Sequence, residues 1–340
     1  MENTDFQSIA SKLLKPLKIL ITTHTSPDGD AIGSSLALAF YLRKKHHHVI
    51  LMAPDPFPDF LAWMPGHNDI LVFSKDREAC ITAIGNADMI IAADYNNFAR
   101  LNDAAPLVRQ SKAVKVLIDH HLNASDEFSL KISVSRISST SELVYSIIEA
   151  MGDNDLLDKE IAECIYAGII TDTGSLSYSC NYVKTYLIVA ELIRLGVDGE
   201  HLHRLIYDTY SESRLRLLGY SISDQLTVLP GYHTAFITLS KADLEKFNHQ
   251  IGDTEGVVNY ALSIKDINLA ALFMERDGIV KASFRSKGNF SVDKLAREHF
   301  NGGGHRNAAG ANLETSLAET VSKFRDILPS YQDALKSVYS

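Results

Sequence analysis

Residues 18–45 read KILITTHTSPDGDAIGSSLALAFYLRKK, an apolar run, a polar loop and a helix-like segment in direct succession. The first run, KILITTH (18–24), is continuously apolar until its end, which is typical of a strand buried on both faces of a parallel sheet. The segment 31–45 predicts a helix whose basic C-terminal end complements the helix dipole. The loop between them carries His24, Asp28 and Asp30.

Further apolar runs continue this pattern through the first half of the chain. Each is rich in Val and Ile and is followed by a stretch with a helical pattern. Strands that alternate with helices favour a doubly wound α/β domain with a parallel sheet. The runs are HVILMA (48–53), DMIIAAD (88–94) and VKVLIDH (114–120).

The second half is divided differently. Ser139 and Glu142 form a capping-box signature before an apolar helix, and two more helices are predicted at 159–170 and 183–197. We expect a first domain over 1–197, a helical linker over 198–226, and a smaller mixed α/β domain over 227–340. In the last region strands are predicted at 233–240, 268–276 and 278–286, and helices at 254–264, 291–300 and 316–328.

Length and composition limit the class of protein. A chain of 340 residues is long for a single core, so two domains are expected. No apolar run reaches the length of about 18 residues that a transmembrane helix needs, and the N-terminus lacks the pattern of a signal peptide. The three widely spaced cysteines suit a reducing compartment. We therefore expect a cytoplasmic protein without a membrane segment.

The charge balance bears on the substrate. The chain has 33 basic and 42 acidic residues, a net charge of −9. Proteins that grip long nucleic acid through many phosphates usually have a basic excess, so a long duplex is disfavoured. A short phosphorylated substrate fits, because bound metal ions can neutralise a few phosphates locally.

Acidic and histidine side chains recur where the predicted elements end. In open α/β sheets the carboxyl ends of the strands form the ligand crevice, so such residues converge on one edge. They are His24, Asp28 and Asp30 after the first strand, Asp94 after the third, Asp119, His120 and His121 after the fourth, and Asp172 in the later segment GIITDTG.

This inventory suits a two-metal hydrolytic site. Two divalent ions about 3.5–4 Å apart can activate a water and stabilise charge on both sides of a phosphoryl group. Carboxylates with some imidazole suit Mn²⁺, with Fe²⁺, Co²⁺, Zn²⁺ and Mg²⁺ as alternatives that composition does not separate.

Each residue also has a local structural interpretation. Asp28 and Asp30 could form an Asx turn before the helix, and Asp94 could cap the next helix. His24 could be a structural histidine, and Asp172 could close a helix-end turn. All of these interpretations would have to hold together to remove the predicted metal site.

The segment NGGGHRNAAG (301–310) is a second candidate site. Gly302, Gly303 and Gly304 could leave backbone N–H groups open to an anion, and the guanidinium of Arg285 or Arg306 can bind phosphate in bidentate fashion. The alternative is an ordinary surface turn with two solvated arginines.

In their order along the chain, these motifs resemble the DHH phosphoesterases with a DHH-associated C-terminal domain. The similarity is strongest to bifunctional oligoribonucleases that are also 3′-phosphoadenosine-5′-phosphate (pAp) phosphatases. The resemblance implies a bilobal, cytoplasmic, Mn²⁺-dependent enzyme with the substrate in the cleft between the lobes. A homodimer is a further expectation for this chain.

The resemblance also implies residue roles. One ion would be held by His24, Asp28 and Asp94, and the other by Asp30, Asp94, His120 and Asp172, so that Asp94 bridges. Asp119 would orient its neighbours, and His121 would contact the scissile phosphate or serve the leaving group. The substrate's other phosphate and terminal sugar would be held by Arg285, His305 and glycines 302–304, with Arg100 as a phosphate contact or a surface residue.

The subgroup often has an aromatic and then a basic residue where this chain has Leu176 and Ser177, which bears on substrate choice. Other substrates of the wider family are linear or cyclic dinucleotides, single-stranded DNA and polyphosphate. A non-catalytic nucleotide-binding module is a further alternative, but such a protein would be expected to have lost a carboxylate.

Overall fold

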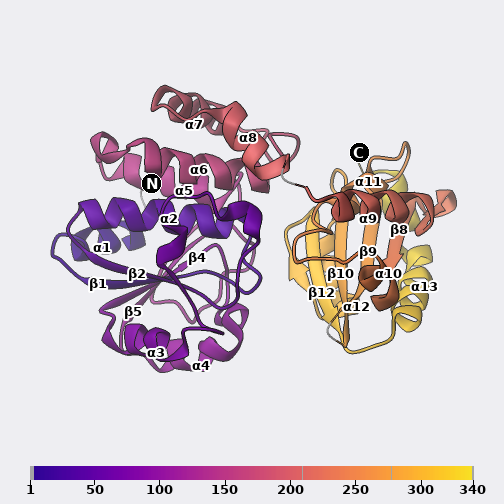
Figure 1. Ribbon diagram of the computed structural model, residues 1–340, viewed down its shortest axis with the longest axis horizontal. Coiled ribbons are helices and arrows are strands. Elements are labelled where there is room, and N and C mark those ends of the chain that lie inside the picture. The colour runs from indigo at the N-terminus through magenta and orange to yellow at the C-terminus, as the bar shows by residue number, and fades with distance from the viewer. Residues whose placement is uncertain (1–3, 209, 277, 339–340) are drawn as a thin grey trace. The chain divides into compact units, whose positions relative to one another are not determined.

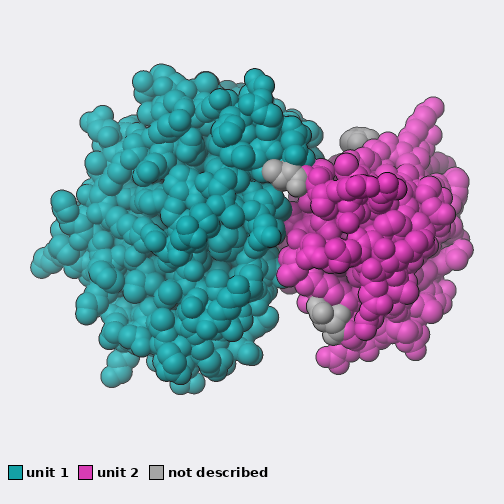
Figure 2. All heavy atoms as spheres, viewed as in Figure 1, with its two compact units in different colours: residues 1–209 teal, residues 210–340 magenta. Residues whose placement is uncertain are grey.

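The computed structural model describes residues 4–208, 210–276 and 278–338, and the chain divides into two compact units, 1–209 and 210–340 (Figures 1 and 2). The predicted linker, 198–226, forms two helices, α8 (Gly199–Tyr207) and α9 (Glu212–Ser223). Helix α8 belongs to the first unit and α9 to the second, so the division falls inside the predicted linker.

The first unit is built on a parallel sheet with the strand order β3-β2-β1-β4-β5-β6. The strands predicted from the apolar runs are β1, β2, β4 and β5. Strands β3 and β6 were not predicted, because three and four residues are too few to show a periodic pattern. The strands are β1 (Lys18–Thr22), β2 (His48–Ala53), β3 (Ile70–Val72), β4 (Met89–Ala93), β5 (Val114–Asp119) and β6 (Leu130–Ser133).

Helices cover both faces of this sheet, which confirms the doubly wound architecture (Figure 1). Along β1, Ile19 and Ile21 enter one apolar core while Leu20 enters the other. The first face is covered by α2 (Gly29–Lys44), α5 (Thr140–Ala150) and α6 (Lys159–Asp172), with α1 (Thr4–Lys12) against β6 and with α7 (Val183–Arg194) and α8 outside. The second face is covered by α3 (Arg77–Asn86) and α4 (Ala105–Gln110).

The strand order determines where a ligand can bind. The chain runs outward from β1 to β3 and then returns to place β4 on the other side of β1. Connections therefore leave β1 and β4 in opposite directions, which opens a crevice at their carboxyl ends. His24 lies just beyond β1 and Asp94 directly beyond β4, so both flank this crevice.

The second unit contains a mixed sheet with the strand order β11-β12-β10-β9-β8-β7. Among the described residues, β8 and β9 pair in parallel and the other neighbouring strands pair antiparallel. Its strands are β7 (Leu226–Leu229), β8 (Thr234–Leu239), β9 (Leu269–Arg276), β10 (Ile279–Ser286), β11 (Gly303–Gly304) and β12 (Ala308–Leu313). Its helices are α9, α10 (Lys241–Lys246), α11 (Val257–Leu262), α12 (Val292–Phe300) and α13 (Leu317–Lys336).

An aromatic core joins this sheet to its helices. Phe324 of α13 is fully buried, with its ring centroid 5.1 Å from that of Phe273 on β9 and 6.1 Å from that of Phe284 on β10. Such aromatic packing contributes beyond area burial alone. It holds β10, which carries Arg285, against the rest of the unit.

Candidate metal centre

The first group of candidate ligands joins the loop after β1 to the end of β4. His24 Nε2 lies 3.5 Å from Asp94 Oδ2 and 3.9 Å from Asp28 Oδ1. The other ring nitrogen of His24 lies 2.8 Å from the carbonyl oxygen of Thr25. A proton placed there leaves Nε2 as an acceptor facing the two carboxylates, as a metal-binding histidine requires. The group could hold one metal ion.

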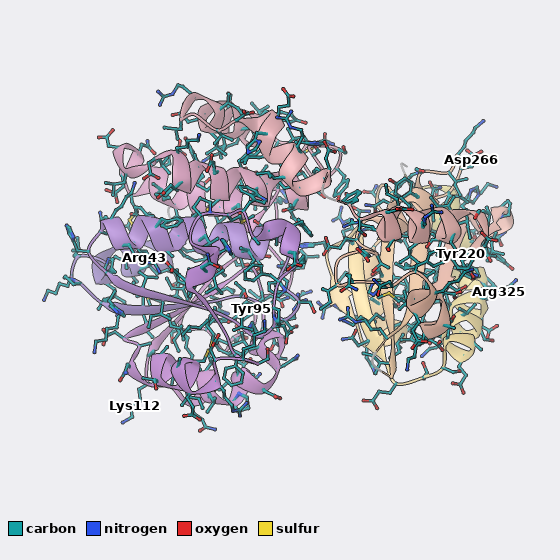
Figure 3. The ribbon with its side chains drawn as sticks, in the orientation of Figure 1. Arg43, Tyr95, Lys112, Tyr220, Asp266 and Arg325 are labelled. Carbon is teal, nitrogen blue, oxygen red and sulfur yellow. The ribbon has the colours of Figure 1, made fainter. Side chains whose placement is uncertain are left out.

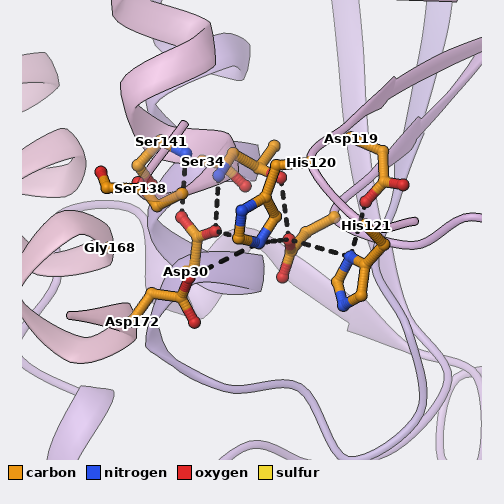
Figure 4. A network of polar contacts seen from close by, with 12 residues as sticks. Asp30, Ser34, Asp119, His120, His121, Ser138, Ser141, Gly168 and Asp172 are labelled. Carbon is orange, nitrogen blue, oxygen red and sulfur yellow. Dashed lines mark hydrogen bonds and ion pairs between the residues drawn. The ribbon is translucent and has the colours of Figure 1, made fainter. Parts of the chain in front are cut away.

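A second group surrounds His120 (Figure 4). Its Nε2 lies 3.5 Å from Asp172 Oδ2, 3.5 Å from Asp94 Oδ1 and 3.8 Å from Asp30 Oδ2. Asp30, His120 and Asp172 have ligand atoms within 4.8 Å of one another and could hold a second ion. The structure therefore brings together all the residues that the sequence analysis singled out as metal ligands.

Asp94 stands between the two groups. Its Oδ2 faces His24 and its Oδ1 faces His120, each at 3.5 Å from the imidazole Nε2. A carboxylate whose oxygens point to different ligand clusters has the geometry of a bridging ligand. The side chain is 1% exposed, so water contributes little to stabilising its charge.

The backbone at Asp94 is unusual and is anchored by its neighbour. Asp94 has φ 65°, in the left-handed region, which Asp and Asn tolerate better than most residues. Tyr95 (Figure 3) packs against Phe98 and Phe128, and its hydroxyl lies 2.6 Å from Thr22 Oγ1 at the end of β1. This contact ties the turn after β4 to β1.

The local structural interpretation of Asp28 is correct and coexists with a ligand role. Asp28 is the N-cap of α2, and its Oδ1 accepts hydrogen bonds from the amides of Asp30 and Ala31 at 3.1 and 3.0 Å. A carboxylate has about four lone-pair sites, so capping leaves acceptor capacity for a metal ion. The cap also determines where Asp30 emerges in the first helical turn.

Close helix packing places Asp172. A Cβ on Gly33 of α2 would lie 2.5 Å from the carbonyl oxygen of Cys164 and 3.1 Å from the amide nitrogen of Gly168, so α2 and α6 are in backbone contact. The sequence pattern placed Asp172 just beyond a helix over 159–170. In the structure Asp172 is the last residue of α6. The helix, not a loop, therefore carries this carboxylate into the site.

Asp119 and His121 form a hydrogen-bonded pair beside these groups. His121 Nδ1 lies 2.7 Å from Asp119 Oδ1 and 3.8 Å from Asp94 Oδ1. Asp119 is fully buried, whereas the His121 side chain is 13% exposed. The arrangement fits the predicted role of Asp119 in orienting His121. Arg100 is close enough to affect the pKa values of His24 and His121.

The electrostatics of the cluster favour a bound cation. Burial raises the pKa of Asp94 well above its ordinary value, and the nearby carboxylates of Asp30 and Asp28 raise it further. Burial also raises the pKa of Asp30. For His120, burial lowers the pKa, but Asp172 and Asp30 outweigh burial and the net shift is upward. Packed carboxylates resist simultaneous ionisation, and divalent cations would relieve that repulsion.

The other histidines of the site are held neutral. Burial lowers the pKa of His24, and burial together with His120 lowers the pKa of His121 well below its ordinary value. Burial works against ionisation of Asp28, but His24 and the amide of Ala31 outweigh it, so its pKa is lowered. Neutral imidazoles and an ionised carboxylate are the forms that bind metal ions. The residues present therefore fit a divalent metal centre.

In the second unit the glycine-rich segment is used differently from the prediction. The amide of Gly302 donates to the carbonyl oxygen of Ala296 at 3.0 Å, and that of Gly304 donates to Asp293 Oδ1 at 2.8 Å. The expectation that these amides stay open for an anion is therefore wrong for Gly302 and Gly304. A Cβ on Gly302 would lie 2.2 Å from the carbonyl oxygen of Gly310, so close packing against β12 requires this glycine.

Cationic side chains remain candidates for anion binding in this unit. Arg285 is half-buried on β10 and contacts the carbonyl oxygen of Phe284 at 3.0 Å. Arg306 is exposed and His305 is half-buried. Leu176, in the first unit, packs against the apolar core there, while Ser177 is exposed.

Two sets of polar contacts that hold the candidate site residues were not predictable from the sequence. Thr140 and Ser141, at the start of α5, donate hydrogen bonds to Asp30. Asp293 accepts from Gly304 and also from Arg297 Nε at 2.9 Å. The capping signature around Ser139 marked the start of α5 but gave no sign of what its first amides would bind.

A parallel α/β sheet with clustered carboxylates and histidines at its switch point, followed by a second mixed unit, defines a metal-dependent phosphoesterase architecture. The DHH family N-terminal domain matches residues 18–169, and the DHHA1 domain matches residues 234–336. The chain belongs to the DHH family and is a phosphoesterase. Enzymes of this family need divalent metal ions.

Sequence similarity to known proteins extends over almost the whole chain. The bifunctional oligoribonuclease and PAP phosphatase NrnA of Bacillus subtilis is 30% identical, over 87% of this chain and 89% of that protein. A probable protein of the same name from Streptococcus mutans is 28% identical, over 95% and 98%. The crystal structure of an exopolyphosphatase-related protein from Bacteroides fragilis is 42% identical over 98% of both chains, with a TM-score of 0.91.

No helix within the described ranges is both long and apolar enough to cross a lipid bilayer.

Proposed function

We propose that this protein hydrolyses short oligoribonucleotides to mononucleotides and pAp to AMP. The observation that carries the proposal is the position of Asp94, whose two carboxylate oxygens face separate ligand groups around His24 and His120. The names of the relatives from Bacillus subtilis and Streptococcus mutans support this choice of substrates. The net charge of −9 agrees with short rather than long nucleic acid.

The proposed cofactors are two Mn²⁺ ions, one held by His24, Asp28 and Asp94 and the other by Asp30, Asp94, His120 and Asp172. When bound, two such ions supply a water of lowered pKa and stabilise charge on the phosphoryl oxygens. His121, oriented by Asp119, lies beside this centre with little solvent exposure. Its proposed role is to contact the scissile phosphate or to serve the leaving group, with Arg100 as an additional phosphate contact.

The proposed specificity comes from the second unit. Arg285 and His305 are proposed to hold the nucleotide's other phosphate and terminal sugar, because a guanidinium matches phosphate in bidentate fashion. Gly302, Gly303 and Gly304 are proposed to bring the loop close to the substrate through their lack of side chains, rather than through open amides at 302 and 304.

The substrate proposal is tested by a length series. With Mn²⁺ present, we expect turnover of an RNA dinucleotide and of pAp, and a rate that falls for oligomers beyond about ten nucleotides, since the chain lacks the basic excess that long strands require. Ion-exchange chromatography of labelled products measures each rate. Activity that rises with length beyond ten nucleotides would favour an exonuclease of single-stranded DNA or RNA.

A second substrate class is favoured by one specific comparison. The Bacteroides fragilis structure, at 42% identity, carries the name of an exopolyphosphatase-related protein. Inorganic polyphosphate therefore belongs in the same assay, together with linear and cyclic dinucleotides. Phosphate release from polyphosphate faster than AMP release from pAp would replace the proposed function by that alternative.

Metal removal provides a test that does not depend on substrate. Burial and mutual repulsion of Asp94 and Asp30 destabilise the metal-free fold, and a cation that binds only the folded state stabilises it by about 2.7 kcal/mol at 100-fold excess over its Kd. We expect the melting temperature to rise on adding Mn²⁺ to EDTA-treated protein, and to rise less with Mg²⁺ or Ca²⁺. An equal response to all three ions would contradict the preference for Mn²⁺.

A homodimer is also proposed, and the outer face of α7 supports it. Val183 and Leu187 are 78% and 64% exposed, and Tyr186 and Ile193 are 48% and 45% exposed, at helical spacing along one side. Exposed apolar stripes of this kind mark interaction surfaces more often than free solvent faces. Light scattering on wild type and Leu187→Asp distinguishes a dimer through this face from a monomer.

Location in the cytoplasm is proposed on chemical grounds. Cys80, Cys164 and Cys180 are buried free thiols, as a reducing compartment allows. Cell fractionation with an antibody against the protein tests this.

A further inference from the structure

The N-terminus of α5 is directed at the candidate metal centre. Ser139 is the N-cap, and the next two residues, Thr140 and Ser141, have amides with no intrahelical partner. Thr140 N donates to Asp30 Oδ2 at 2.7 Å, and Ser141 N donates to Asp30 Oδ1 at 2.8 Å. Both oxygens of one buried carboxylate are thus held by the positive end of a helix (Figure 4).

Thr140 makes a further contact that Ser141 does not. Its hydroxyl donates to Asp94 Oδ1 at 2.8 Å. Asp30 lies in the group around His120, whereas Asp94 faces both groups, and the two carboxylates repel each other when both are ionised. One residue with 0% exposure therefore donates one hydrogen bond to each of two neighbouring buried carboxylates.

The start of α5 is itself held rigidly. Ser139 Oγ accepts the amide of Glu142 at 3.0 Å. The Glu142 carboxylate does not return to Ser139, as a reciprocal capping box would require, but accepts from Ser138 and from Thr185 Oγ1 of α7 at 2.7 Å. The first turn is thus fastened to the preceding loop and to α7, so the Thr140 hydroxyl has a defined direction.

We propose that Thr140 is a positioning residue for the metal centre: its amide and hydroxyl hold Asp30 and Asp94 at the spacing and orientation that two adjacent ions need. This inference rests on the proposed function, since it assumes that Asp94 bridges two ions. The contact to Asp94 Oδ1 determines which lone pairs face His120 and fixes the rotation of the bridging carboxylate. Hydrogen bonds to ligating carboxylates commonly contribute 10–100-fold to metal affinity.

The test removes the hydroxyl alone. Thr140→Val keeps the shape and the amide to Asp30 but cannot donate to Asp94, whereas Thr140→Ser keeps both donors. Mn²⁺ binding is measured by titration calorimetry, and low-temperature electron paramagnetic resonance reports magnetic coupling between paired ions. We expect Thr140→Val to weaken the binding of at least one Mn²⁺ by about 10–100-fold and to reduce the coupled signal. Thr140→Ser should restore both.

Thr234→Val is the matched control. Thr234 is also fully buried, but it lies in the second unit, and its hydroxyl donates at 2.8 Å to the carbonyl oxygen of Tyr232. A similar loss of stability with unchanged Mn²⁺ affinity is expected. A coupled Mn²⁺ pair in the wild type that Thr140→Val leaves unchanged, or that Thr234→Val weakens equally, overturns the role of Thr140. Wild-type protein without a coupled pair overturns the proposed two-metal centre, and this role with it.

Discussion

Asp94→Asn is expected to remove hydrolysis of both pAp and RNA dinucleotides while making the metal-free protein more stable. The two oxygens of Asp94 face His24 and His120, so a neutral amide would weaken both ligand groups at once. The loss of activity should exceed about 10³-fold, because removing a single electrostatic stabiliser already costs about 10²–10³-fold in kcat.

The stability should change in the opposite direction. Burial and neighbouring carboxylates raise the pKa of Asp94, which means that its charge is unfavourable in the metal-free fold. Asparagine removes that charge and tolerates the φ of 65° better than alanine would. Steady-state rates with Mn²⁺, and melting temperatures in EDTA with and without added Mn²⁺, measure the two effects.

Asp88→Asn is the matched control for this variant. Asp88 is exposed just before β4, and its carboxylate accepts the amide of Lys18 at 2.8 Å, at the opposite end of the strand from Asp94. We expect nearly unchanged activity and a stability loss of about 1 kcal/mol. Full activity in Asp94→Asn would reject the bridging role, and a metal-free protein less stable than wild type would reject the argument from repulsion.

Gly168→Ala is expected to damage the site and the fold together. Gly168 lies in α6 where that helix meets α2 and α5, and a Cβ there would lie 1.9 Å from Ser141 Oγ and 2.7 Å from Asp30 Oδ1. Both contacts are too short, so α5 or Asp30 must move. We expect a loss of about 1–3 kcal/mol in the free energy of unfolding, as for other overpacked cores. Mn²⁺ affinity and kcat should fall as well, because Asp30 is displaced.

Gly85→Ala separates the steric effect from the loss of a helical glycine. Gly85 is exposed in α3, and a Cβ there meets nothing within 4 Å. Alanine should stabilise the protein by about 0.5–1 kcal/mol through its higher helix propensity, with no effect on activity. Urea denaturation and Mn²⁺ titration of both variants measure the contrast. Unchanged Mn²⁺ affinity in Gly168→Ala would show that the helix contact does not control Asp30.

Elements with a strong and sufficiently long pattern were predictable. The run HVILMA became β2 at the residues expected, because the five apolar residues after His48 have few other favourable environments. Ser139 was correctly identified as a cap, since capping is a local interaction. The strands β3 and β11 were not predicted, because three and two residues gain their structure from neighbouring strands.

For Asp28, capping and metal binding are compatible, although the sequence pattern presents them as alternatives. The residue caps α2 through one oxygen and still lies 3.9 Å from His24 Nε2. For Gly302 and Gly304 the sequence indicated amides open to an anion, whereas these amides donate to Ala296 and Asp293. In each case the partner lies elsewhere in the fold, so the pattern itself held no information about it.

The sequence by itself determined the parallel α/β architecture and the inventory of carboxylates and histidines, because periodicity and residue chemistry are local properties. The family resemblance implied how these residues divide into two groups, but only the tertiary structure decided the contacts that produce the division. That division depends on β1 and β4 lying side by side at the switch point, on the glycine contact between α2 and α6, and on the first amides of α5 reaching Asp30. These are contacts between distant segments, formed by packing, and no spacing along the chain encodes them.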